Sequence, residues 1–205
     1  MITAHEALKR LEAGNRRFIS DASGSAPRLS PLERARLAQG QEPFAIILGC
    51  SDSRVPAELV FDQGFGDLFV IRVAGNVVAP SQIGSVEFAA ARFGTRLAVV
   101  LGHTQCGAVM ATLDEIRQPE TRWSRHLKSI VDRIRPAVEP LLHEFGDQPA
   151  ALLRQAVRAN IQASVNQLRH GSAILEHLIK AEGLLVIGAE YSLETGVVEF
   201  LDAPT

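Results

Sequence analysis

Four short runs of apolar residues recur along the chain, and their pattern predicts the strands of a buried sheet. The runs cover 44–48, 68–73, 97–101 and 184–187. Apolar and polar residues do not alternate within them, as is typical of parallel strands that helices cover on both faces. A fifth run, 197–201, follows a Glu-Thr-Gly turn at 194–196, so we expect it to pair antiparallel with the fourth strand.

Segments with the 3.6-residue period of helices separate these runs. We expect helices over 81–93, 106–116, 123–145 and 150–181, with a break near His170 and Gly171. This alternation predicts an α/β fold with a mostly parallel central sheet flanked by helices. The common strand order 2-1-3-4, with 197–201 as an antiparallel edge strand, places the first and third strands side by side.

The first forty residues are expected to form an N-terminal helical arm. Residues 3–18 have the apolar spacing of an amphipathic helix, and Thr3 and Glu6 are spaced as a capping box. A polar loop over 20–31 and a short helix over 31–38 follow, with Pro31 in the first turn. No linker breaks the 205 residues, so we predict a single domain over 1–205 that includes this arm.

Composition excludes several classes of partner. The net charge is −2 and the isoelectric point about 6.3, which gives no basic field for nucleic acid or anionic membranes. The N-terminus has no apolar signal region, and no run of 18 apolar residues occurs. We therefore expect a cytoplasmic protein that binds neither nucleic acid nor membrane.

The only two cysteines follow directly on two of the predicted strands. Cys50 ends the first apolar run, and His103 and Cys106 follow the third. If these strands are neighbours, their carboxyl ends open a common crevice. Two thiolates and one imidazole make the three-ligand set of a catalytic zinc site, which keeps a fourth position open.

The sequence favours three other interpretations of the cysteines less. Cysteine is often buried as a small apolar residue, but the matched placement with a nearby histidine favours a metal. A disulfide is disfavoured because nothing indicates an oxidising compartment. A structural zinc would need a fourth protein ligand, for which Asp52 is the nearest candidate.

Asp52 and Arg54 form the second candidate group. An exposed pair of this kind contributes only about 0–1 kcal/mol to stability, whereas beside a metal it would be functional. Asp52 could bind the zinc or accept a hydrogen bond from zinc-bound hydroxide. Because Arg54 offers the carboxylate a bidentate partner that competes with the metal, we expect Asp52 to pair with Arg54.

These motifs resemble the signature of the β-class carbonic anhydrases. The resemblance is carried by Cys-Ser-Asp-Ser-Arg at 50–54 and His-x-x-Cys-Gly at 103–107, and it extends over nearly the whole chain. It implies one Zn²⁺ per subunit held by Cys50, His103 and Cys106, with Asp52 and Arg54 as the catalytic dyad. It also implies that zinc-bound hydroxide attacks CO₂ to give bicarbonate and a proton. The substrate pocket that it implies consists of Gln41, Phe69, Ala74, Phe88 and Gly107.

The resemblance also bears on assembly and regulation. It implies a homodimer or a dimer of dimers in which the N-terminal helix reaches a neighbouring subunit. Phe88 stands where many members have tyrosine, so any role of that hydroxyl is lost. A subset of the family binds inhibitory bicarbonate through a tryptophan, an arginine and a tyrosine. Here the last two are Arg72 and Tyr191, but Ile47 replaces the tryptophan, so we expect that site to be absent or crippled.

Two alternative functions remain open on the sequence alone. A hydrolase of carbonyl sulfide or carbon disulfide could use the same scaffold, because fold and metal do not fix the substrate. A non-catalytic zinc protein could sense bicarbonate or redox state through its thiolates. The presence of both Asp52 and Arg54 favours an enzyme over a sensor.

Overall fold

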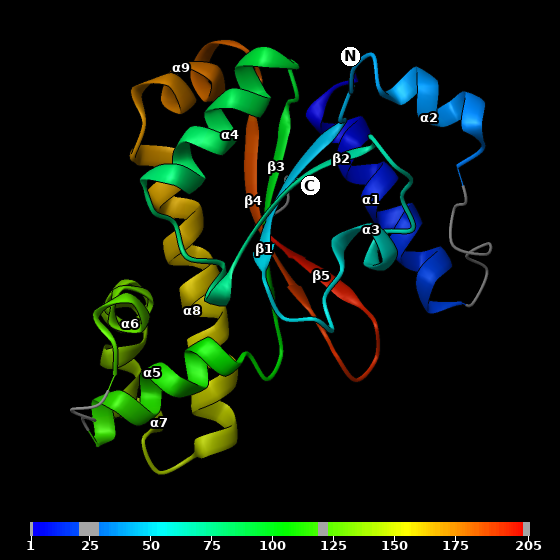
Figure 1. Ribbon diagram of the computed structural model, residues 1–205. Helices are drawn as coiled ribbons and strands as arrows, with labels where there is room; N and C mark the ends of the chain where they lie inside the picture. The colour runs from blue at the N-terminus through cyan, green and yellow to red at the C-terminus, as the bar shows by residue number, and fades with distance from the viewer. Residues whose placement is uncertain (1, 21–28, 119–122, 203–205) are drawn as a thin grey trace.

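A five-stranded sheet lies at the centre of the computed structural model, which describes residues 2–20, 29–118 and 123–202 (Figure 1). The strand order is β2-β1-β3-β4-β5. The four parallel strands and the antiparallel β5 confirm the predicted order and edge strand. The strands are β1 (Ala45–Cys50), β2 (Leu68–Val73), β3 (Leu97–His103), β4 (Leu185–Tyr191) and β5 (Val198–Leu201).

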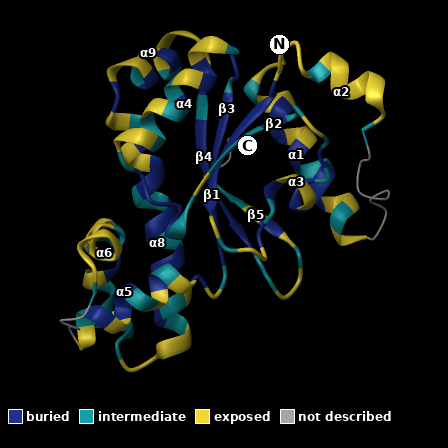
Figure 2. Ribbon diagram, in the orientation of Figure 1, coloured by how far each residue is buried: buried dark blue, intermediate teal, exposed yellow. Residues whose placement is uncertain are grey.

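Helices cover both faces of the sheet, and the three central strands β1, β3 and β4 are buried (Figure 2). One face packs against α4 (Pro80–Arg92), α5 (Gly107–Arg117), α6 (Arg125–Val138), α8 (Pro149–His170) and α9 (Ala173–Ala181). The other face packs against α1 (Ala4–Ile19) and α3 (Ala57–Val60). The predicted break after His170 is confirmed, because α8 ends there and α9 begins at Ala173.

Two local predictions differ from the structure. The single helix expected over 123–145 is divided into α6, a 3₁₀ turn η2 (Glu139–Leu141) and α7 (Leu142–Phe145). Pro140 lies at this division, where its missing N–H and its ring disfavour a continuous helix. Strand β2 is not covered on both faces as expected, because it is an edge strand of which only Leu68 is buried.

Helix α8 packs unusually close to β3 and β4. A Cβ added at Gly102 would lie 2.5 Å from Ile161 Cδ1, and one added at Gly188 would lie 2.7 Å from Ile161 Cγ2. The Ile161 side chain therefore occupies the space that a side chain at position 102 or 188 would need. This contact brings the middle of α8 near the carboxyl ends of the strands.

The N-terminal helix is held within its own chain. The capping box is confirmed, since Thr3 Oγ1 accepts a hydrogen bond from the Glu6 amide and the Glu6 carboxylate accepts one from the Thr3 amide. Leu8 and Leu11 are buried, so α1 is not a free arm. By contrast, α2 (Pro31–Leu37) buries no residue. Most of the loop predicted over 20–31 lies outside the described residues.

Among the described residues, the helices are all too short or too polar to cross a membrane.

Candidate active site

Three metal-ligating side chains converge where β1 and β3 end. Cys50 is the last residue of β1, His103 is the last of β3, and Cys106 is the N-cap of α5. Their ligand atoms all lie within 4.8 Å of one another. Both cysteines are free thiols, so the disulfide interpretation is not supported. The convergence predicted from the strand order is thus present in the fold.

The backbone carbonyl of the next residue, Thr104, orients the His103 ring as a metal ligand. The ring is fully buried, and Nδ1 lies 2.8 Å from the carbonyl oxygen of Thr104, to which it donates. This tautomer leaves a lone pair on Nε2, which has no hydrogen-bond partner among the described residues. Metal-ligating histidines typically donate their other ring N–H to a carbonyl in this way, which leaves the second nitrogen, here beside two thiols, free to bind the metal.

The two sulfurs are electrostatically coupled. A hydrogen bond from the Cys106 thiol, which outweighs the cost of burial, lowers the pKa of Cys50. The same hydrogen bond, together with burial, raises the pKa of the Cys106 thiol. A divalent ion bound between the two sulfurs would allow both to be thiolates. This donor set suits a thiophilic metal with one coordination position left open.

Backbone groups that the sequence could not reveal support the sulfurs. The Gly75 amide donates to Cys50 Sγ at 3.3 Å, and the amides of Ala108 and Val109, at the start of α5, face the Cys106 sulfur. Arg72 donates from Nε to the Cys50 carbonyl at 3.0 Å. Its Nη2 atom also donates to the Asp52 carbonyl, so Arg72 holds the backbone on both sides of Ser51 in place.

Asp52 and Arg54 form the predicted bidentate pair. Arg54 Nε lies 2.9 Å from Asp52 Oδ1, and Nη2 lies 2.7 Å from Oδ2. These bonds hold the pKa of Asp52 well below its usual range, so the carboxylate is ionised at neutral pH. Oδ2 also lies 3.8 Å from His103 Nε2. The Asp52 side chain is only 16% exposed, which separates it from an ordinary surface pair.

The predicted pocket residues fall into two groups. Ala74 begins the 3₁₀ turn η1 (Ala74–Asn76) beside the end of β1, and Gly107 begins α5, so both lie near the metal-ligating side chains. Gln41 precedes β1, whose length alone spans roughly 16 Å at about 3.3 Å per residue. Phe69 lies early in β2, with its ring centroid 6.2 Å from that of Phe88.

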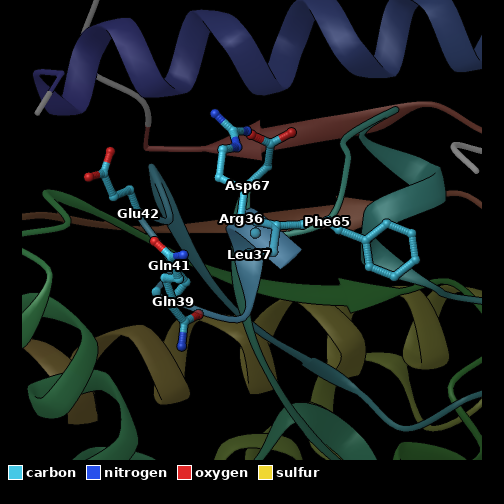
Figure 3. A pocket seen from close by; sticks show the side chains of 9 residues that line it. Arg36, Leu37, Gln39, Gln41, Glu42, Phe65 and Asp67 are labelled. Carbon is cyan, nitrogen blue, oxygen red and sulfur yellow. The ribbon is translucent and has the colours of Figure 1, made fainter. Parts of the chain in front are cut away.

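Gln41 instead lines a separate pocket of about 510 Å³ (Figure 3). Its walls come from the end of α2, the segment before β1 and the loop before β2, and include none of the three metal-ligating residues. A single chain therefore does not bring Gln41, Phe69 and Phe88 to the three metal-ligating side chains.

Comparisons with known proteins identify close similarities. A family model described as carbonic anhydrase matches residues 45–198. Carbonic anhydrase 2 of Mycobacterium tuberculosis is 37% identical over 93% of this chain and 89% of its own length. The carbonic anhydrase of Mycolicibacterium smegmatis is 38% identical over 94% of this chain and 91% of its own.

Solved structures agree in fold. The β-carbonic anhydrase CafA of Aspergillus fumigatus superposes with a TM-score of 0.75 at 25% identity, covering 98% of this chain and 91% of that one. One of two tetrameric β-carbonic anhydrases from Sordaria macrospora gives a TM-score of 0.76 at 23% identity, covering 98% of each chain.

Proposed function

The chain belongs to the β-class carbonic anhydrase family, and we propose that it catalyses the reversible hydration of CO₂ at a zinc ion held by Cys50, His103 and Cys106. The observation that carries the proposal is the convergence of two free thiols and an unpartnered imidazole nitrogen at adjacent strand ends. Three protein ligands leave the open position that catalytic zinc requires.

A bound zinc ion would act as a Lewis acid that lowers the pKa of water, so that hydroxide is available near neutral pH. The overall reaction forms one bond between oxygen and the carbon of CO₂ and releases one proton to buffer. Two thiolates neutralise the charge of the metal, so the acidity of the water depends more on its surroundings here than at an all-histidine site. The amides at the start of α5 and the Arg54 guanidinium supply positive potential there.

Asp52 and Arg54 are proposed to act together as the catalytic dyad. The ionised carboxylate can accept a hydrogen bond from the attacking water or hydroxide and orient its lone pair towards CO₂. Arg54 occupies both carboxylate oxygens and so favours Asp52 remaining off the metal. Ala74 and Gly107 are proposed to border the space for CO₂, because they lie beside the metal-ligating side chains and present little or no side chain.

We propose that a second copy of the chain completes the pocket. Gln41, Phe69 and Phe88 are expected to contact substrate, yet they lie far from the metal-ligating residues of their own chain. Phe88 is 53% exposed, and its ring packs at a tilt against Phe69 and edge-on against Phe93 in an aromatic group that a partner could cover. A homodimer, or a dimer of dimers, would therefore bring these residues to the partner's zinc site.

The free thiols support a reducing compartment. Cys50 and Cys106 must stay reduced to bind a metal, and proteins of the cytoplasm keep their thiols in that form. We therefore propose a cytoplasmic enzyme.

The proposal is tested by comparing substrates on zinc-loaded protein. Stopped-flow measurement of proton release from CO₂ is expected to show catalysis, and sulfide release from carbonyl sulfide or carbon disulfide is expected to be much slower. Faster sulfide release would favour the hydrolase. Zinc-loaded, folded protein that accelerates none of these reactions would favour a non-catalytic zinc protein.

A further inference from the structure

The turn between β2 and α4 has a left-handed backbone at two successive residues, a conformation that costs nothing at Gly75 but is uncommon for a residue such as Asn76. Gly75 has φ +68° and Asn76 has φ +44°, so two successive residues lie in the left-handed region. A Cβ at position 75 would also lie 2.8 Å from Ile134 Cδ1 and 3.0 Å from Ala108 Cβ. A turn of this kind persists only where its surroundings hold it in place.

Two polar side chains of α8 provide that hold. Asn160 Nδ2 donates to the Gly75 carbonyl at 2.8 Å, and Ser164 Oγ donates to the Asn76 carbonyl at 3.0 Å. The two are four positions apart (i and i+4), so they lie on one face of α8. Asn160 is 2% exposed and Ser164 is 4% exposed, so water does not compete for these bonds. Ile161, next to Asn160, fixes the distance of α8 from the sheet.

The same turn contacts the metal site. The Gly75 amide donates to Cys50 Sγ, while the Gly75 carbonyl accepts from Asn160. The amide and the carbonyl belong to the two peptide groups that flank one α-carbon, so fixing the second restricts the φ and ψ angles that aim the first. We propose that Asn160, supported by Ser164, is a positioning residue that holds the Gly75 amide on the Cys50 thiolate and so sets metal affinity.

This inference rests on the proposed metal site and extends it to a helix that contributes no ligand. An amide aimed at a thiolate stabilises the charged sulfur and keeps it where the other two ligands can share a metal. Without the Asn160 bond, the strained turn can relax and carry the amide away from the sulfur. Loss of a hydrogen bond that supports a metal ligand typically lowers metal affinity by about 10- to 100-fold.

The test uses full-length protein with zinc and with cobalt as probes. Asn160→Leu keeps the approximate volume of the side chain and removes its donor. Competition with a chromophoric chelator at pH 7.5 is expected to show zinc affinity lowered by about 10-fold or more. In the cobalt-substituted variant, the thiolate-to-cobalt charge-transfer band is expected at longer wavelength, because a sulfur without its N–H donor gives up electrons more easily.

Two further variants keep the test decisive. Ser164→Ala removes the supporting bond with a smaller change in the core, and it is expected to shift both readouts in the same direction to a lesser degree. Ser172→Ala is the control, because Ser172 caps α9 and bonds to Glu87 rather than to the turn. It should lower stability and leave affinity and spectrum unchanged.

The outcomes separate this inference from the proposed function. Wild-type protein that binds neither zinc nor cobalt would overturn the metal site itself. Wild-type protein that binds both metals, with an Asn160→Leu variant whose affinity and charge-transfer band match those of Ser172→Ala, would overturn the role of Asn160 alone.

Discussion

Asp52 lies between two competing positive partners, the guanidinium of Arg54 and the proposed metal. In the structure Arg54 binds both carboxylate oxygens, although Oδ2 lies only 3.8 Å from the free nitrogen of His103. We expect Arg54→Ala to release the carboxylate onto the metal and to lower the rate of CO₂ hydration by more than 100-fold, with zinc content unchanged.

Arg54→Lys is the matched control, because lysine retains the positive charge but cannot form the bidentate contact with the Asp52 carboxylate. It should retain an intermediate rate. An Arg54→Ala variant that keeps the wild-type rate would contradict the gating role of this pair.

The depressed pKa of Asp52 predicts a specific pH dependence of stability. Hydrogen bonds from Arg54 lower the pKa of this carboxyl below its ordinary value, so the folded protein binds its proton at lower pH than the unfolded chain does. The resulting stabilisation is present above about pH 4 and is lost as the pH falls through the lowered pKa.

In urea unfolding of metal-free protein, the advantage of wild type over Asp52→Asn should be about 1 kcal/mol at pH 6 and should become steadily smaller as the pH falls below about 4. An advantage independent of pH would show that the Asp52 pair does not contribute through its charge.

For individual residues, the sequence predicts which side chains form the site better than it predicts which backbone groups contact them. The spacing of Cys50, His103 and Cys106, together with the strand order, was enough to place them together, and Asp52 was correctly paired with Arg54. The amide of Gly75 and the carbonyl of Thr104 were not predicted, because every residue carries such groups and only the folded geometry aims them at the site.

Helix α8 packs against the sheet through Ile161, which lies against Gly102 and Gly188. Gly188 has no room for a Cβ beside Ile161, so Gly188→Ala should lower the free energy of unfolding by about 1–3 kcal/mol. Ile161→Ala alone, which removes the Cγ2 atom that the added Cβ would meet, should cost about 2–5 kcal/mol.

If the clash is the cause, the double variant should be less destabilised than the sum of the two single changes by about 1 kcal/mol in denaturant unfolding. Strict additivity would place the cost of Gly188→Ala elsewhere than at Ile161.

The long elements were predictable and the short ones were not. Apolar runs and helical periodicity located all five strands and the principal helices, because each long element buries a stripe or face of its own. Helix α3 and the turn η1 were not predicted, because segments of four and three residues are too short to show a helical periodicity of apolar positions. The exposure of β2 was missed because an edge position depends on its neighbours, which the composition of the run does not encode.

One chain by itself does not bring Phe69 and Phe88 to its metal-ligating side chains. If both residues contact substrate, the protein is expected to self-associate. Phe88 is exposed in α4 beside Phe69 and Phe93. Phe88→Arg should therefore shift the protein from dimer or tetramer towards monomer in sedimentation velocity at micromolar concentration, because it would bury a charge in the interface.

Leu127→Arg in α6 is the control, since Leu127 is comparably exposed at 46% and lies outside the aromatic group. A wild-type monomer at micromolar concentration, or equal effects of the two substitutions, would contradict the proposed interface.

The measurement that tests the account most directly is CO₂ hydration by one preparation before metal removal, after removal and after zinc is returned. We expect activity to disappear with the metal and to return in full at one zinc per subunit, and we expect Cys106→Ser to neither retain the zinc nor regain the activity. Folded protein that carries one zinc per subunit and hydrates CO₂ no faster than buffer would contradict the central claim.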